Sequence, residues 1–186
     1  SAGGTDLDSA WGLALDPDNN VFVTGYFTST NATWGTTNLT ADANRQGDGF
    51  LAKYDPHGHL LWVRSISGPG WEAGYSVATD ATGAAYVTGE FSSLESRFDP
   101  LTAHRDRSNG ADLFIAKYDR DGQAVWVETA RIPAGGSASV TGETIAVNRA
   151  GELFVAGSLD PGVTHFGPSL TLTNSDLNHV GFIAKL

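Results

Sequence analysis

A long internal repeat constrains this chain more than any other feature of its sequence. Residues 50–63 return as residues 114–127, a shift of 64, with eight of the 14 positions identical. The same pattern begins again at Phe182, after a further shift of 68. Repeats of this length are typical of proteins in which each module adds one supersecondary unit to a continuous core. We therefore expect three modules, the third incomplete: residues 1–66, 67–130 and 131–186.

Single residues mark the same register more sharply. The chain contains only three lysines, and all three occupy one repeat position. A glycine recurs in every module, and a tryptophan recurs in the first two. These shared residues are Gly25, Gly89 and Gly157, Lys53, Lys117 and Lys185, and Trp62 and Trp126. The four extra residues of the second shift lie between Trp126 and Asn148, which predicts an inserted loop around residues 134–139.

Each complete module predicts four β-strands and no helix. The apolar blocks are four to seven residues long, rich in Val, Phe, Tyr, Leu and Trp, and bounded by Asp, Asn, Gly or Pro. Between the second and third strands lies a stretch of 22 residues with an aromatic residue at a fixed register. Such a long connection predicts a short extra strand or an Ω-like excursion pinned by the ring. The stretches are residues 28–49, 92–113 and 160–181, with Trp34, Phe98 and Phe166.

The strand chemistry favours an all-β fold of four-stranded β-propeller blades, and a β-trefoil-like fold is the alternative. Segments such as Val21–Thr24 and Leu60–Val63 are apolar on both faces, as in a sheet packed between two neighbours. A propeller ring needs about four to eight blades to close. We therefore expect a partial propeller, either part of a longer ring or completed by a second copy of the chain.

Composition narrows the class of function. With 21 Asp+Glu against 11 Lys+Arg, the formal net charge is −10, which disfavours nucleic acid and anionic membrane surfaces as partners. No segment is long and apolar enough for a transmembrane helix. Cysteine is absent, which removes disulfides, thiolate metal sites and cysteine nucleophiles. Methionine is absent too and the chain opens at Ser1, so we expect a processed piece.

The order of motifs within a module matches a known pattern. An apolar-Ala-apolar-Asp strand at residues 13–16 is followed by VTGxF at 23–27, an aromatic-Gly pair at 34–35, and DxFxAKYDxxGxxxWV at 48–63. This order resembles the bacterial SBBP-type β-propeller repeat and covers nearly the whole chain. The third module departs from it, with Val180 and Asn148 in place of two aspartates. The resemblance implies a secreted or surface-attached bacterial protein without a defined activity, and it carries over no catalytic residue.

Residues shared by the modules are expected to serve packing. Trp62 and Trp126 are predicted to anchor the contact between blades. The repeated lysine is predicted to pair with a carboxylate of a neighbouring blade, such as Asp48 or Asp112, or to lie over a tryptophan ring.

Residues outside the repeat pattern are the candidates for ligand binding. Trp71 lies in a Gly/Pro-rich connection in which no other module has a tryptophan. With the adjacent carboxylate of Glu72, it suits stacking on a sugar ring plus a hydroxyl contact, and packing of Trp71 against a neighbouring blade is the alternative. The residue after the repeated glycine varies between modules, which indicates a ligand-facing position or simple tolerance: Tyr26, Glu90 and Ser158.

Metal and catalytic signals are weak. Asp16, Asp18 and Asn20 have the alternating oxygen spacing that begins a calcium loop, but the EF-hand glycine and distant glutamate are missing, so an Asx turn is the alternative. The sequence has no nucleophile elbow and no phosphate-binding loop, so no catalytic residue is predicted. No cofactor is predicted either, and calcium is only a candidate at the Asp16 turn. The leading hypothesis is a non-enzymatic, extracellular binding or display module for a glycan or a protein. Part of a polysaccharide-active enzyme and a structural spacer are the alternatives.

Overall fold

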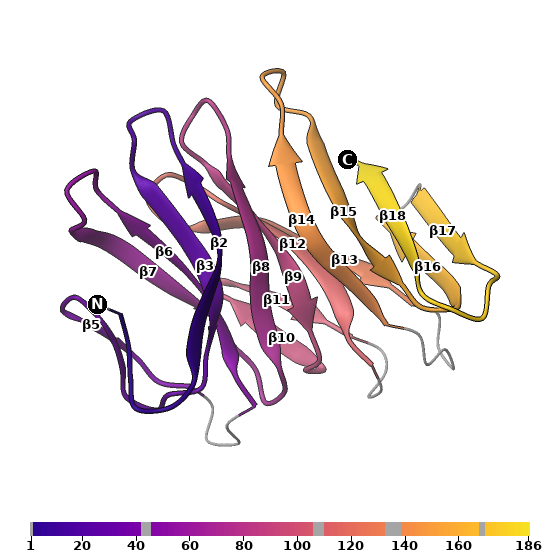
Figure 1. Ribbon diagram of the computed structural model, residues 1–186, viewed down its shortest axis with the longest axis horizontal. Helices are drawn as coiled ribbons and strands as arrows, with labels where there is room; N and C mark the ends of the chain where they lie inside the picture. The colour runs from indigo at the N-terminus through magenta and orange to yellow at the C-terminus, as the bar shows by residue number, and fades with distance from the viewer. Residues whose placement is uncertain (1, 42–45, 106–109, 133–138, 168–169) are drawn as a thin grey trace.

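The computed structural model describes residues 2–41, 46–105, 110–132, 139–167 and 170–186 (Figure 1). Within these ranges the regular secondary structure consists of β-strands without any helix, so the expected all-β class is confirmed. No helix in the described ranges is therefore long and apolar enough to cross a membrane. The predicted loop insertion around residues 134–139 lies outside the described residues except for Ser139.

Each module forms one antiparallel sheet, or blade, whose strands follow the order of the chain. The first blade contains β2 (Asp8–Leu15), β3 (Val21–Phe27), β6 (Asp48–Tyr54) and β7 (Leu60–Ile66). The second contains β8 (Glu72–Thr79), β9 (Ala85–Phe91), β12 (Asp112–Tyr118) and β13 (Ala124–Arg131). The third contains β14 (Val140–Val147), β15 (Leu153–Leu159) and β18 (Val180–Lys185).

Tight turns join these strands where the sequence predicts them. In the turn between β6 and β7, the Gly58 N–H donates to the carbonyl of Asp55 at 3.0 Å, and Gly122 donates to Asp119 at the same distance between β12 and β13. Both glycines have a positive φ, 85° and 80°, which glycine adopts without a Cβ clash. The Asp-x-x-Gly pattern therefore encodes the turn.

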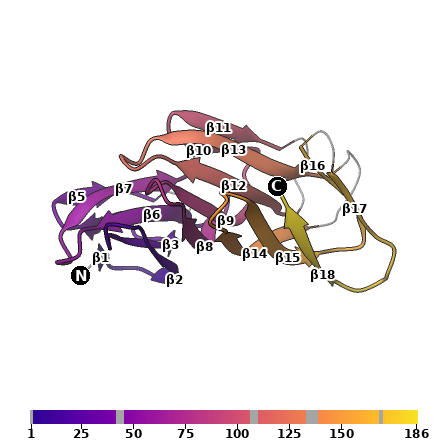
Figure 2. The same cartoon turned by 90° about the horizontal axis from the view of Figure 1, so that it is seen from above.

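The blades fan out around one side of the molecule. β8 contacts both β2 and β14, and these first strands lie along one side in Figure 2, whereas β7 and β13 lie on the other. Neighbouring blades share hydrophobic cores: Leu51 with Val77 between blades 1 and 2, and Ile115 with Ile145 between blades 2 and 3. Sheets packed face to face around an axis that passes their first strands are propeller blades, so the predicted fold is confirmed.

In its described residues, the 22-residue stretch of each module contains two short paired strands, where the sequence predicts one short extra strand or an Ω-like excursion. The hairpins are β4 (Ala32–Trp34) with β5 (Thr37–Leu39), β10 (Glu95–Phe98) with β11 (Leu101–His104), and β16 (Gly162–Phe166) with β17 (Leu170–Asn174). The repeated aromatic residue ends the first strand of each hairpin. Trp34, Phe98 and Phe166 are only 2%, 0% and 4% exposed, so the ring pins the excursion as expected.

Each hairpin pairs with the segment that precedes the first strand of its own blade. For the second and third hairpins, this segment lies at the end of the outermost strand of the preceding blade, β7 or β13. We call this contact the rim pairing. Its residue pairs are Gly3 in β1 (Ala2–Gly3) with Thr33, Ser67 with Arg97, and Arg131 with His165. The hairpin of the third module consequently extends the second sheet to six strands, in the order β17-β16-β13-β12-β9-β8. Neighbouring blades are therefore joined by backbone hydrogen bonds at the rim as well as by side-chain packing.

Candidate functional site

The first strand of every blade carries the same irregularity. In β2 the pairing register with β3 shifts between Ala10 and Gly12, and equivalent shifts occur in β8 and β14. Each shift is a β-bulge, in which one extra residue leaves the ladder and its side chain is re-aimed. The bulged residues are Trp11, Tyr75 and Glu143.

The repeated glycine stands opposite this bulge. A Cβ on Gly25, Gly89 or Gly157 would lie 1.9 Å from a backbone carbonyl oxygen of the first strand. No side chain fits at that separation, so only glycine lets the bulged strand approach so closely. The shared glycine register and the shared bulge therefore have one structural cause.

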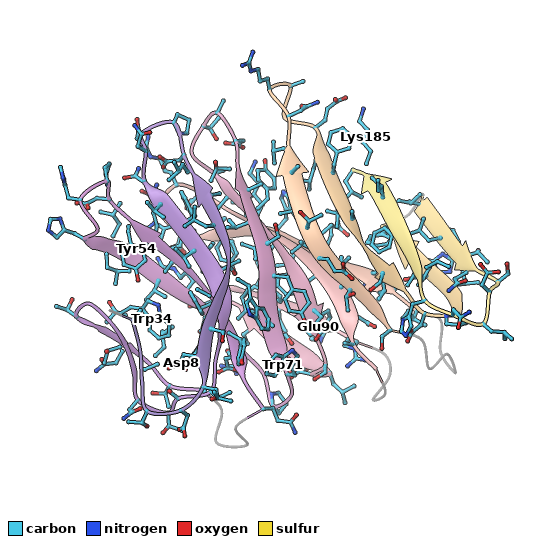
Figure 3. The ribbon with its side chains drawn as sticks, viewed as in Figure 1. Asp8, Trp34, Tyr54, Trp71, Glu90 and Lys185 are labelled. Carbon is cyan, nitrogen blue, oxygen red and sulfur yellow. The ribbon has the colours of Figure 1, made fainter. Side chains whose placement is uncertain are left out.

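Two bulged residues join the predicted ligand residues in an aromatic cluster. The Trp11 ring centroid lies 4.7 Å from that of Tyr26 and 5.1 Å from that of Tyr75. Tyr26 in turn lies 4.7 Å from Trp71, and the three ring pairs are tilted by 48°, 51° and 50°. Trp11 is 49% exposed, so the cluster opens to solvent. We call Trp11, Tyr26, Trp71, Tyr75 and Glu90 the aromatic patch, and Figure 3 places Trp71 and Glu90 in the lower half of the blades.

The patch includes hydrogen-bonding groups as well as rings. The Tyr75 hydroxyl donates to a carboxylate oxygen of Glu90 at 2.5 Å. Burial, this hydrogen bond and the charge of Glu90 raise the pKa of Tyr75, and the exposed Glu143 of the next blade adds to the effect. Tyr75 therefore stays protonated, and the patch presents apolar ring faces next to negatively charged oxygen acceptors.

The structure brings three of the four predicted ligand residues together in this patch, namely Tyr26, Trp71 and Glu90. Trp71 also covers Gly47 of the first module, where a Cβ would lie 2.8 Å from the ring. One part of the half-buried Trp71 ring therefore packs on the neighbouring blade, as the alternative interpretation expects, and another part contacts Tyr26 of the patch. Stacking of Trp71 on a sugar ring stays a prediction.

Glu72 does not join the patch. It is fully buried, and one carboxylate oxygen accepts hydrogen bonds from the Ser93 N–H at 3.2 Å and the Ser96 hydroxyl at 3.0 Å. Burial raises the pKa of Glu72 above its ordinary value, although these hydrogen bonds oppose the shift. Glu72 holds the start of the β10–β11 hairpin, and the carboxylate of the patch is that of Glu90, which contacts Tyr75.

Trp11 and Tyr75 are functional candidates that the comparison between modules does not single out. Their register holds a different residue in every module, with Glu143 in the third, but unlike the register of Tyr26 and Glu90 it does not directly follow a residue repeated in all modules. The sequence offers only an indirect signal. The glycine repeated in the second strand lies opposite a β-bulge, in which the first strand contains one extra, unpaired residue.

The candidate calcium ligands form a turn. One carboxylate oxygen of Asp16 accepts from the backbone N–H groups of Asp18 and Asn20 at 3.0 and 2.9 Å, and the other lies 3.1 Å from Lys53 Nζ. Burial opposes the ionised form, but the hydrogen bonds from Asn20 and the charge of Lys53 outweigh it and lower the pKa of Asp16. These contacts are those of an Asx turn. In the described part of the chain, no group of three or more His, Asp or Glu side chains is arranged to hold a metal.

The repeated lysine pairs within its own blade. Lys53 lies 4.9 Å from the ring centre of Phe22 as well as beside Asp16. The equivalent contacts are those of Lys117 with Asp80 at 3.7 Å and Tyr86 at 4.9 Å, and of Lys185 with Glu152 at 2.5 Å and Phe154 at 5.9 Å. The expected partners Asp48 and Asp112, and the expected tryptophan ring, are therefore wrong. The lysine and the ring are direct cross-strand partners, which aims the amine at the turn between the first two strands.

Comparison with known proteins adds relatives but no family. No protein-family model matches the chain. Over 127 residues it is 30% identical to an uncharacterized WD repeat-containing protein, L264, of Acanthamoeba polyphaga mimivirus, a match that covers 61% of this chain and 9% of that protein. Over 113 residues it is 30% identical to the regulatory protein FlaEY of Caulobacter vibrioides, covering 60% of this chain and 11% of FlaEY. The chain thus spans about a tenth of the length of these curated relatives, and the WD repeat relative agrees with the propeller blades.

Proposed function

We propose that the chain is a non-enzymatic β-propeller segment that binds a neutral carbohydrate at the aromatic patch. The observation that supports this most directly is a contrast at the bulge. The backbone there is the same in all three blades, whereas the bulged residue and the residue after the repeated glycine differ. Packing alone would repeat the side chains with the backbone, so the variation marks positions available for recognition.

The chemistry of the patch suits a sugar. The apolar face of a pyranose ring stacks on an exposed aromatic ring such as that of Trp11, and its hydroxyls donate to the carboxylate of Glu90. The net charge of −10 disfavours phosphorylated or otherwise anionic ligands. A stable protein partner needs about 800 Å² of contact surface on each side, roughly 20 or more residues, which exceeds five clustered side chains.

We further propose that the parent protein is secreted or attached to a bacterial surface, as the resemblance to the SBBP-type repeat supports. In that protein the ring is closed by further blades of the same repeat or by a second copy of this chain. Light scattering tests the second copy, because a folded species at twice the 19.5 kDa mass favours it and a monomer argues for further blades.

Calorimetric titration with soluble β-glucan, xylan and mannan tests the binding proposal. The Trp11→Ala variant is expected to bind the recognised polysaccharide at least about tenfold more weakly, with an unchanged unfolding midpoint, because the ring is half exposed. Leu13→Ala is the matched control, since it removes another exposed apolar side chain of β2 outside the patch and should leave binding unchanged. Binding of none of the three polysaccharides, or equal binding by Trp11→Ala and the unmodified chain, contradicts the proposal. Release of reducing sugar would favour an enzyme instead.

A further inference from the structure

The joint between the first two blades is built around Trp62. The Trp62 indole Nε1 donates to the carbonyl oxygen of Arg120 at 3.1 Å, in the tight turn between β12 and β13 of the next blade. Gly122 of this turn lies against the indole face, where a Cβ would come within 2.7 Å of the ring. Arg64 Nε donates to the Gly122 carbonyl at 2.8 Å. Hydrogen bonds from the indole and the guanidinium therefore hold the Asp-x-x-Gly turn, and its glycine lets the turn lie directly against the indole ring.

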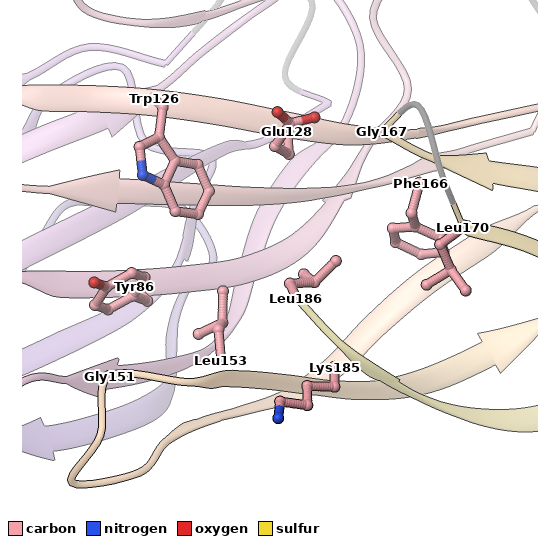
Figure 4. Close-up of a pocket in the computed structure, with 10 residues that line it drawn as sticks. All are labelled: Tyr86, Trp126, Glu128, Gly151, Leu153, Phe166, Gly167, Leu170, Lys185 and Leu186. Atoms are coloured by element: carbon pink, nitrogen blue, oxygen red, sulfur yellow. The ribbon is translucent and has the colours of Figure 1, made fainter.

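Trp126 stands at the same register on β13, and there the joint is open. It lines a groove of about 720 Å³ with apolar walls that include Leu153, Phe166 and Leu170 (Figure 4). Its ring centre lies 6.0 Å from that of Tyr86. Within the described residues, the indole N–H of Trp126 has no hydrogen-bond acceptor equivalent to the one that Trp62 uses.

β18 borders the same groove through Lys185 at its end. It is an edge strand of its sheet, whereas the equivalent strands β6 and β12 are each paired with a fourth strand on that side. Unpaired backbone groups along a strand edge are a template for the addition of another strand.

We propose that the Trp126 groove is a docking site for a tight Asp-x-x-Gly turn followed by an extended strand that pairs with the free edge of β18. The occupant has the chemistry of residues 119–131: a glycine against the Trp126 ring, a turn carbonyl that accepts from its Nε1, and an apolar outer strand. This is strand addition guided by an anchoring pocket. The inference is independent of carbohydrate binding, because none of the groove residues belongs to the aromatic patch.

One residue changes what the occupant must carry. Glu128 lines the groove at the register that Arg64 occupies in the first joint. A carboxylate accepts hydrogen bonds where a guanidinium donates them. Carbonyl oxygens of a docked turn would face this negative charge, so the best occupant presents a Lys or Arg side chain toward Glu128.

An extension that appends the sequence of residues 119–131 directly after Leu186 tests the proposal, because Leu186 holds the register of Tyr118. The covalent link gives the extension a high effective concentration. Hydrogen exchange of the β18 amides is expected to slow by at least about tenfold, and the urea midpoint is expected to rise. The same extension with its glycine replaced by leucine should do neither, because at the equivalent Gly122 even a Cβ would come within 2.7 Å of the indole, which leaves no room for a side chain. Unchanged exchange in β18, or equal protection by the leucine version, overturns the proposal.

Two substitutions in the groove identify the docking site itself. Trp126→Ala should abolish the protection that the extension gives. Glu128→Arg restores the pairing of the first joint, so it should slow exchange in the extended chain by a further factor of about three or more. Protection that survives Trp126→Ala, or that weakens with Glu128→Arg, would show that the extension docks elsewhere and would overturn the proposal.

Discussion

The two ends of each blade follow different rules. At the turn end, where the loops between the first two strands project upward in Figure 1, all three blades place a lysine between a carboxylate and an aromatic ring. At the bulge end, all three blades share a backbone irregularity and its glycine, but the side chains displayed there differ. Stability thus depends on repeated side chains at one end and on a repeated backbone at the other, which leaves the side chains of the bulge end available for binding.

The third blade shows how strictly the turn end is maintained. Asn148 stands where the other blades have aspartate, so the lysine of this blade loses its usual partner. Glu152, four residues further along the same turn, supplies a carboxylate oxygen to Lys185 instead. The ion pair is therefore preserved even though the residue is not. No such compensation preserves one contact at the bulge, where Trp11 and Tyr75 are aromatic but Glu143 is a carboxylate.

The largest expected effect comes from filling the space opposite a bulge. Gly89→Ala places a Cβ 1.9 Å from the Ala73 carbonyl oxygen, so either the bulge or the strand pairing must give way. We expect a loss of about 4 kcal/mol in the free energy of unfolding, measured by urea denaturation. Gly151→Ala is the control, because it has open space around it and only its φ of 81° is strained. It should cost about 1 kcal/mol, and an equal loss for both variants would show that the bulge is not what requires glycine.

A smaller effect is expected from the turn end. Lys53→Met leaves the buried carboxylate of Asp16 without its cation, because the two side chains are only 5% and 1% exposed. The expected loss is about 3 kcal/mol. Lys185→Met should cost much less, because its ion pair with Glu152 is exposed to solvent and such pairs contribute little. Equal losses in thermal or urea unfolding would mean that the ring contact, and not the buried charge pair, is what stabilises this end.

The smallest effect is a pH dependence at Glu72, which lies at the bulge end but belongs to the scaffold. Because its pKa is raised in the folded state above the ordinary 4.5, the folded protein holds a proton there that the unfolded chain releases first. The contribution of Glu72 to stability is therefore largest at low pH and falls as the pH rises from 4.5 through the raised folded value.

Glu72→Gln removes this titration. The difference in unfolding free energy between Glu72→Gln and the unmodified chain should shift in favour of the variant between pH 4 and pH 7, as measured in paired urea titrations. A difference that stays constant across this range would mean that the pKa of Glu72 is not raised in the folded protein.

Much of the fold could be predicted because its causes are local. The Asp-x-x-Gly turns, the apolar strands and the pinned excursion at Trp34, Phe98 and Phe166 are each encoded within a few residues. The rim pairing could not be predicted, because it joins a strand end to a hairpin about 30 residues away through backbone hydrogen bonds that leave no mark on the side chains.

The candidate site was only partly predictable for a related reason. Tyr26, Trp71 and Glu90 stand out as differences between modules, but Trp11 and Tyr75 depend on a bulge that is visible only once two strands are paired. Glu72 stands out as an acid beside a tryptophan, yet its equivalent in the first module, Asp8, is also an acid that holds the start of a hairpin through Ser29. That match is evidence for a structural carboxylate. The lysine partner was missed because Asp16 and Lys53 lie far apart in the sequence and meet only across the sheet.

The rim pairing has a mechanical consequence. A force that pulls neighbouring blades apart must break backbone hydrogen bonds between β13 and β16 before it can separate the cores beneath them. Each module is thus tied to the next by backbone hydrogen bonds. A force applied at one end of the chain is therefore transmitted through all the blades, and the blades do not separate one at a time. Single-molecule stretching between the two ends of the chain would register this as one concerted rupture rather than a series of separate steps.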